Sequence, residues 1–294
     1  GLLAIDATAL KIPDNTLSSI APTVAVALAE DIGCCDLTTG LVDKDAIVGA
    51  TIISRGSLVL AGQAWADEVF RQLDQSVVID WYIGDAQTAE PDDVICKLVG
   101  PARALLSGER TALNFLQTMS STATLTAEYV AAIDGTGAAI LDTRKTIPGL
   151  RLAQKYAVTC GGGRSHRIGL FDAVLIRPSH IRSAGSIAAA LAAAAELGDD
   201  ILIQIEVKDH DQLIQALDAG APRILLDNFS IAALKKAVEA NRGYGYVAAE
   251  LEAAGNVALS SVREIADTGV DFISTAAITE NVDAVDLSMQ FKID

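Results

Sequence analysis

The chain has 294 residues, of which 51% are hydrophobic and 20% are charged, and its formal net charge is −16 at pH 7. An acidic protein repels the phosphate backbone of nucleic acid, and no apolar stretch reaches the ~18 to 20 positions that cross a bilayer. We therefore expect neither a nucleic-acid partner nor a membrane span.

The length, the first residues and the cysteines narrow the class further. At this size we expect one large barrel-like domain, alone or with a smaller companion. The opening sequence GLLAIDATALKIPD lacks a basic region and a cleavage signature, so we expect a cytoplasmic location. The four cysteines lack the spacing of a zinc knuckle, and we expect reduced structural thiols at Cys34, Cys35, Cys96 and Cys160.

The first third of the chain predicts a small α+β domain. A short helix is expected over 23–30, and alternating apolar segments at 49–54 and 77–83 predict strands. Over 105–133 the apolar residues recur at helical spacing, which predicts one or two long helices as the bridge to the rest of the chain.

The rest of the chain repeats a strand followed by a helix. Strands are expected at 139–142, 173–177, 202–207, 224–227, 249–253 and 272–275, and helices at 186–196, 211–219, 231–240 and 260–268. The last three units recur roughly every 22 to 25 residues, as the βα units of a parallel barrel do. Six or seven such units are visible, so the barrel is expected to be incomplete.

Residues 144–182 concentrate positive charge in this acidic protein. Eight of the 22 Lys and Arg residues lie there, and the only carboxylate among them is that of Asp172. Together with His166 and His180, these cations predict a pocket for a ligand that carries carboxylates, phosphates or both.

Polar residues stand where the predicted strands end, which is where α/β barrels bind their ligands. They are Thr143, Arg144 and Lys145 after the first strand, Arg177 after the second, Glu206 on the third, Asp227 on the fourth, and Glu252 and Gly255 on the fifth. The early strands supply cations and the later ones carboxylates. This division predicts an anion-holding half and a half able to hold a divalent metal such as Mg²⁺.

Each of these assignments has an alternative. Arg144 and Lys145 offer two kinds of anion contact, but they could form an exposed basic loop. Glu206 and Asp227 could share Mg²⁺ or pair with a nearby Arg or Lys. His166 could donate a hydrogen bond to an anion or act as a general base, and no GxSxG nucleophile motif accompanies it.

Several sequence motifs resemble those of the quinolinate phosphoribosyltransferase family. The similarity runs from about residue 25 to the end with the same order and spacing. The motifs are GERTALNF at 108–115, LDTRKTIPGLR at 141–151, YAVTCGGGRSHRIGLFDA at 156–173, IEV ending at 207, LDNF at 226–229, LEAAGNV at 251–257 and TGVDFIS at 268–274.

The resemblance implies an amino-terminal α/β sandwich domain over 1–113 and an incomplete, seven-stranded α/β barrel over 114–279, with 280–294 packing back on the first domain. It implies a homodimer with shared active sites. The family reaction joins quinolinate to 5-phosphoribosyl 1-pyrophosphate with Mg²⁺ and gives nicotinate mononucleotide, pyrophosphate and CO2 in NAD biosynthesis.

The resemblance also implies roles for individual residues. Arg144, His166 and Arg167 would hold the quinolinate carboxylates, with Arg110 reaching in from the neighbouring subunit. The implied catalytic residues are Lys145, Glu206 and Asp227, of which the two carboxylates would also serve the ribose hydroxyls and the metal. The remaining substrate-binding residues are Thr143, Arg177, Ala254, Gly255, Thr275 and Ala276.

This chain departs from the family pattern at a few of these positions. Arg177 stands where relatives usually have Lys, Ala254 where they have Ser, and Ala276 where they have Gly. These changes fall on the phosphoribosyl side and put affinity for the sugar phosphate in question. Two alternatives therefore accompany the main hypothesis: a paralogous phosphoribosyltransferase with another acceptor or reduced activity, and a non-catalytic anion-binding protein.

Overall fold

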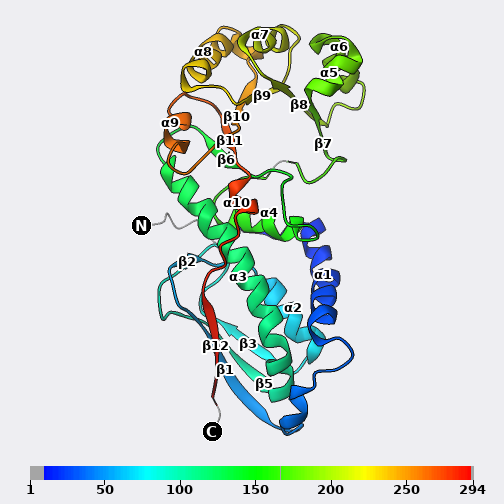
Figure 1. The fold of residues 1–294 in the computed structure, drawn as a ribbon, viewed down its shortest axis with the longest axis vertical. Helices are drawn as coiled ribbons and strands as arrows, with labels where there is room; N and C mark the ends of the chain where they lie inside the picture. Colours follow the sequence, from blue (N-terminus) through cyan, green and yellow to red (C-terminus); the bar gives the residue numbers. More distant parts are fainter. Residues whose placement is uncertain (1–9, 166, 293–294) are drawn as a thin grey trace. The chain divides into compact units, whose positions relative to one another are not determined.

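The computed structural model describes residues 10–165 and 167–292, which form two compact units (Figure 1). The first unit contains the described residues of 1–127, 146–162 and 278–294, and the second contains those of 128–145 and 163–277. The chain therefore passes between the units several times. A single boundary between residues 113 and 114 stays a prediction about domains.

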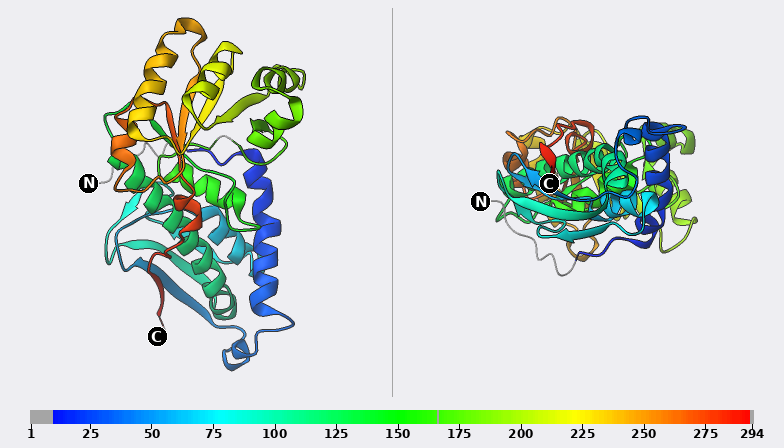
Figure 2. Two further views of the ribbon diagram at one scale, coloured as in Figure 1. Left: turned by 45° about the horizontal axis from the view of Figure 1, so that its top comes forward. Right: turned by 90° about the horizontal axis from the view of Figure 1, so that it is seen from below.

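The first unit is built on a four-stranded antiparallel sheet in the order β12-β1-β5-β3. Helices α2 and α3 cover one face of this sheet and bury Phe70, Leu105 and Leu113 against it (Figures 1 and 2). The carboxy-terminal strand pairs with β1 and forms one edge of the sheet. The elements are β1 (Ile47–Ser54), β3 (Val78–Trp81), β5 (Val94–Pro101), β12 (Leu287–Lys292), α2 (Gln63–Leu73) and α3 (Ala102–Ala132), with a small sheet of β2 (Leu58–Val59) and β4 (Thr88–Ala89) and a 3-10 turn η2 (Thr38–Leu41).

Two helices of the first unit differ from the sequence-based expectation. Helix α1 (Asp14–Ile32) was expected only over 23–30; it begins nine residues earlier and contains Pro22. Its buried residues recur every four positions along one stripe, which faces the core. Helix α4 (Arg151–Cys160) was not predicted as a helix at all, and it packs against α1.

Asp85 connects α2 and α4 by hydrogen bonds within this unit. Its carboxylate accepts hydrogen bonds from the backbone N–H groups of Gly62 (2.9 Å) and Gln63 (3.1 Å) at the start of α2. It also accepts one from the Tyr156 hydroxyl of α4 at 2.8 Å. Burial raises the pKa of Asp85 to about 6, against the effect of these three donors.

The second unit contains a parallel sheet of six strands in the order β6-β11-β10-β9-β8-β7. All six predicted strands are confirmed, and α6, α7 and α8 lie on the outer side of the curled sheet (Figure 1). The strands are β6 (Ala139–Leu141), β7 (Ala173–Ile176), β8 (Leu202–Val207), β9 (Arg223–Asp227), β10 (Glu250–Ala254) and β11 (Phe272–Ser274). The helices are α5 (Pro178–Ala184), α6 (Ile187–Ala195), α7 (His210–Asp218), α8 (Ile231–Arg242) and α9 (Val262–Ala266), with a 3-10 turn η3 (Gly245–Val247) and α10 (Ala277–Glu280) at the junction with the first unit.

The incomplete α/β barrel is confirmed, with six regular strands where seven were expected, among the residues that the structure describes. The barrel is open between β6 and β7. Beside β6, Arg164 makes a short parallel bridge: its N–H donates to Ile140 O at 2.8 Å, and its carbonyl accepts from Asp142 N at 3.2 Å. The chain around Arg164 is rich in glycine and cations and lacks the apolar run of a regular strand.

Across the described ranges, every helix is too short or too polar for a transmembrane segment.

Gly161 offers a test of how closely α4 and α3 pack. A Cβ atom at this position would lie 2.3 Å from Ala123 O and 2.6 Å from Thr126 Cβ. Because these neighbours belong to a packed helix, we expect Gly161→Ala to lower the free energy of unfolding by about 1–3 kcal/mol, measured by chemical denaturation. Gly56→Ala is the control, since a Cβ there meets nothing within 4 Å. Equal effects of the two substitutions would contradict the close packing.

Candidate active site

The first group of expected site residues follows β6 and forms a tight turn. The Thr143 hydroxyl oxygen accepts a hydrogen bond from Lys145 N at 3.0 Å, and this bond encloses Arg144. The turn begins beside Asp142, which is 1% exposed. A partly buried arginine and an exposed lysine thus leave the same strand end from a fixed backbone.

Two of the predicted cations, Arg144 and Arg177, act electrostatically on a third, Arg167. The pKa of the Arg167 guanidinium lies below its usual value because the group is partly buried and because Arg144 and Arg177 bring like charge close to it. Asp172 and Glu252 oppose this shift. The structure therefore brings Arg144, Arg167 and Arg177 into one positive region, which a bound anion would relieve. His166, expected in the same group, lies outside the described residues.

The two predicted carboxylates come from neighbouring strands, Glu206 from β8 and Asp227 from β9. The pKa of Glu206 is raised, first by burial and then by the negative charge of Asp227. Arg177 Nε lies 3.9 Å from Glu206 Oε2, with 66% of the Arg177 side chain exposed and 15% of that of Glu206. Glu206 thus has Arg177 as a distant charge partner, which is the alternative role expected for this carboxylate.

The expected phosphate-facing residues lie at the ends of β10 and β11. Gly255 has a φ of 90°, which glycine adopts readily, and Ala254 pairs in register with Asp227. The N–H of Thr275 donates to Leu141 O at 3.1 Å, and its hydroxyl accepts from Ala277 N at 3.2 Å. These backbone donors of the loop after β11 are therefore used within the protein.

A buried polar cluster lies on the strands behind these residues; Glu252 was expected at the strand ends with the other carboxylates, but its partners Gln204 and Ser274 were not predicted. Glu252 is 2% exposed, and it accepts hydrogen bonds from the Gln204 amide and the Ser274 hydroxyl. Burial raises the pKa of Glu252, which Gln204, Ser274 and the cations Arg167 and Arg223 lower in part. The available signal was a polar residue in the middle of an apolar strand, as in LIQIEV over 202–207.

Arg110 lies on α3 in the first unit with an exposed side chain. It is not among the residues that the second unit gathers at its strand ends. Its contribution to the site of a neighbouring subunit stays a prediction.

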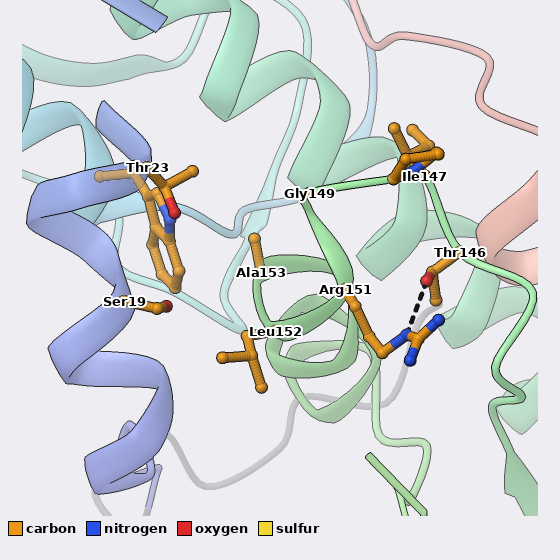
Figure 3. Close-up of a pocket in the computed structure, with 10 residues that line it drawn as sticks. Ser19, Thr23, Thr146, Ile147, Gly149, Arg151, Leu152 and Ala153 are labelled. Carbon is orange, nitrogen blue, oxygen red and sulfur yellow. Dashed lines mark hydrogen bonds between the residues drawn. The ribbon is translucent and has the colours of Figure 1, made fainter. Parts of the chain in front are cut away.

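A separate pocket of about 290 Å³ lies in the first unit between α1 and α4 (Figure 3). Ser19 and Thr23 line it from α1, and Arg151 and Leu152 line it from α4. Arg151 Nε donates a hydrogen bond to Thr146 Oγ1 at 3.0 Å, as Figure 3 shows. Apart from Arg151, one of the cations of 144–182, the residues that line this pocket were not expected in the site.

Comparison with known proteins places these motifs in one family. The family model "Quinolinate phosphoribosyl transferase, N-terminal domain" matches residues 36–120, and the one for the C-terminal domain matches residues 122–290. The chain is 38% identical to a probable nicotinate-nucleotide pyrophosphorylase [carboxylating] of Bacillus subtilis, over 88% of this chain and 89% of that protein. It is 36% identical to a chloroplastic nicotinate-nucleotide pyrophosphorylase [carboxylating] of Arabidopsis thaliana, over 97% and 86%. The solved structure of the nicotinate-nucleotide pyrophosphorylase from Francisella tularensis superposes with a TM-score of 0.89 at 44% identity, covering 96% of this chain and 98% of that one.

The coupling of the two carboxylates gives a prediction for the Mg²⁺-free protein. Replacing Asp227 by Asn removes a negative charge beside Glu206, so ionising Glu206 becomes less costly and its pKa should fall. Carboxyl ¹³C NMR of the unaltered and Asp227→Asn proteins measures this change. The exposed Asp199→Asn is the control and should leave Glu206 unaffected. A Glu206 pKa that does not fall in Asp227→Asn would show that the two carboxylates are not coupled.

Proposed function

The chain belongs to the quinolinate phosphoribosyltransferase family, and from the arrangement of its side chains we propose how it carries out the reaction of that family. It transfers the phosphoribosyl group of 5-phosphoribosyl 1-pyrophosphate to quinolinate with decarboxylation. The products are nicotinate mononucleotide, pyrophosphate and CO2, in NAD biosynthesis. The observation that carries the residue assignment is the positive region of Arg144, Arg167 and Arg177 beside the coupled carboxylates of Glu206 and Asp227.

Quinolinate binds to the positive region in this proposal. Arg144 and Arg167 each take a carboxylate, because a planar guanidinium matches a carboxylate with two parallel hydrogen bonds. His166 adds a third donor. The turn closed by Thr143 supports this role, since it fixes Arg144 before the substrate arrives. Lys145, exposed on the same turn, reaches the carboxylate and phosphoribosyl groups as a point charge.

The sugar phosphate binds along the ends of the inner strands. Glu206 and Asp227 contact the ribose hydroxyls and stabilise the positive charge that grows on the ribose carbon as pyrophosphate leaves. Arg177 lies near Glu206, which supports a contact of Arg177 with the phosphoribosyl side. The loops that carry the expected phosphate-side residues Ala254, Gly255, Thr275 and Ala276 face the 5-phosphate.

Glu206 and Asp227 would be the protein ligands of Mg²⁺ in this proposal. Burial and then the negative charge of Asp227 raise the pKa of Glu206, and a divalent cation beside the two carboxylates would favour the ionised form of Glu206. Within the described ranges, no group of three or more His, Cys, Asp or Glu side chains could hold a metal ion. The donor set therefore suits Mg²⁺, which commonly takes one or two carboxylates and completes its shell with substrate phosphates and water. When bound, the ion supplies neutralising charge for the leaving pyrophosphate.

No nucleophile of the protein enters this mechanism. The ring nitrogen of quinolinate attacks the ribose carbon, and the bond from that carbon to the pyrophosphate oxygen breaks. Loss of the 2-carboxylate as CO2 then leaves an electron pair that the positively charged pyridinium ring stabilises. The protein contributes by holding the two anions in contact, so positioning by Arg144 and Arg167 accounts for much of the rate.

The remaining parts of the proposal concern assembly and location. Arg110 is exposed on α3, which suits a residue that completes the site of a second subunit in a homodimer. All four cysteines carry free thiols, which suits a reducing compartment and supports a cytoplasmic location.

A second candidate is a paralogue of the family with a different acceptor or weak turnover. It is favoured by Ala254 and Ala276, whose methyl groups stand where the family resemblance implies a hydroxyl and a bare backbone. An assay of CO2 release by the unaltered chain distinguishes the two candidates. Only the first candidate turns over quinolinate efficiently.

The proposed function predicts CO2 release from ¹⁴C-labelled quinolinate that requires both Mg²⁺ and 5-phosphoribosyl 1-pyrophosphate. Arg144→Ala should weaken quinolinate binding at least about 100-fold, since it removes a charged, bidentate contact of roughly 3 kcal/mol. Isothermal titration measures this change, and Arg182→Ala, an exposed arginine on α5, is the control. An unchanged dissociation constant in Arg144→Ala would remove that residue from the site, and the absence of CO2 from the unaltered chain would reject the function.

The shared site of the homodimer predicts complementation between two inactive variants. Arg110→Ala and Arg144→Ala subunits that are unfolded and refolded together should regain about a quarter of the activity of the unaltered protein. Half of the dimers are then mixed, and one of the two sites in each mixed dimer has both arginines. Each variant refolded alone is the control. A mixture as inactive as its components would argue against a site shared between subunits.

A further inference from the structure

The ends of β9 and β10 carry an unusual backbone. Among the described residues, four other than glycine have a positive φ, and two of them lie here: Asn228 at 56° and Asn256 at 52°. Gly255, next to Asn256, has a φ of 90°. Left-handed conformations are uncommon outside glycine, and they cluster at sites where the surrounding structure enforces them.

The two asparagines form a chain of hydrogen bonds that ends on Asp227. Asn256 Nδ2 donates to Asn228 Oδ1 at 3.0 Å, and Asn228 Nδ2 donates to Asp227 Oδ1 at 3.1 Å. Because one bond holds the amide oxygen of Asn228, its NH2 group is directed at the carboxylate. We call Asn256 and Asn228 the amide relay.

The backbone confines this relay on two sides. Asn228 N donates to Ala254 O at 2.9 Å, which extends the pairing of β9 and β10 past the end of β9. A Cβ atom on Gly255 would lie 2.3 Å from Asn228 Oδ1 and 2.6 Å from its Cγ. The side chain of Asn228 therefore lies directly over the Gly255 backbone, in space that only glycine leaves open.

Ala254 explains why Asp227 depends on this relay. Ala254 pairs in register with Asp227 on the neighbouring strand, and its side chain is a methyl group that cannot donate a hydrogen bond. The side-chain amide of Asn228, the next residue along the chain, donates a hydrogen bond to the Asp227 carboxylate instead.

We propose that Asn228 and Asn256 are positioning residues, which hold one oxygen of Asp227 so that the carboxylate is oriented for the sugar pyrophosphate before it binds. This inference rests on the proposed function, in which Asp227 contacts the ribose hydroxyls and Mg²⁺. A carboxylate fixed in advance loses less rotational freedom when the ligand arrives, which strengthens binding of that ligand alone.

A purely structural role for the relay makes a different prediction. If the asparagines only stabilise the turns after β9 and β10, their removal lowers the melting temperature and affects both substrates equally or neither. A selective change in affinity for the sugar pyrophosphate separates the two roles.

The test uses Asn228→Gly and Asn256→Gly, because glycine keeps the left-handed backbone and removes only the amide. We expect Asn228→Gly to weaken binding of Mg²⁺–5-phosphoribosyl 1-pyrophosphate about tenfold, as the loss of a hydrogen bond to a charged group does. Asn256→Gly, one step further away, should weaken it roughly threefold. Quinolinate affinity should stay within about twofold in both. Isothermal titration of the sugar pyrophosphate without quinolinate measures binding apart from turnover, and CO2 release gives KM and kcat.

Asp92→Gly is the matched control, since Asp92 is also exposed with a φ of 70° but belongs to the first unit. It should leave both affinities unchanged. Unchanged affinity for the sugar pyrophosphate in Asn228→Gly and Asn256→Gly overturns the inference, as does an equal loss for both substrates. If Asn228→Gly fails to fold, Asn256→Gly alone decides between these outcomes. If the inference fails but the unaltered chain turns over normally, the proposed function stands. If the unaltered chain shows no turnover, both the proposed function and this inference are overturned.

Discussion

Crowding of like charges at one edge of a parallel sheet is the constraint on which the site depends. Parallel strands deliver all their carboxyl ends to the same edge, so the residues that follow them meet regardless of their distance in the sequence. Arg144 and Arg177 both act on Arg167, and Asp227 acts on Glu206. Each group of like charges is unfavourable without a ligand, and the apolar strands behind them supply the stability that keeps the groups together. In the proposed function, a dianionic pyridine beside a Mg²⁺-bound sugar pyrophosphate would relieve both.

The opening of the barrel determines where each kind of charge stands. The strands β6 and β7 occupy the two ends of the sheet order, and Arg144 and Arg177 follow them. The inner strands β8 and β9 carry the carboxylates. Between β6 and β7 the chain leaves the second unit over 146–162 and returns with Arg164 and Arg167. Further regular strands that closed the barrel would fill this space with backbone hydrogen bonds. Instead, the sequence between β6 and β7 includes the glycine-rich segment 161–167, which carries Arg164 and Arg167.

Sequence patterns predicted the second unit better than the details of its site. All six strands were located because short, mainly apolar segments alternate with helical ones at a regular spacing, and the motifs identified the charged residues at their ends. The cluster around Glu252 and the amide relay were not predicted, because they join residues of different strands, and which residues become neighbours depends on strand register. Helix α4 escaped prediction because its polar and charged residues, such as Gln154 and Lys155, are buried in the first unit. Local patterns give the strand ends, while tertiary contacts decide which polar groups face each other.

The departures from the family pattern are concentrated on the sugar-phosphate side. Ala276 follows β11 and Ala254 ends β10. In the sheet, β10 lies between β11 and β9, the strand that carries Asp227. Because Ala254 offers no hydroxyl next to Asp227, the orientation of that carboxylate depends more heavily on the amide of Asn228 than it would with serine at 254. No departure falls on Arg144 or Arg167. In the proposed site, the departures therefore concern the contacts to the ribose and its phosphates and leave those to quinolinate unchanged.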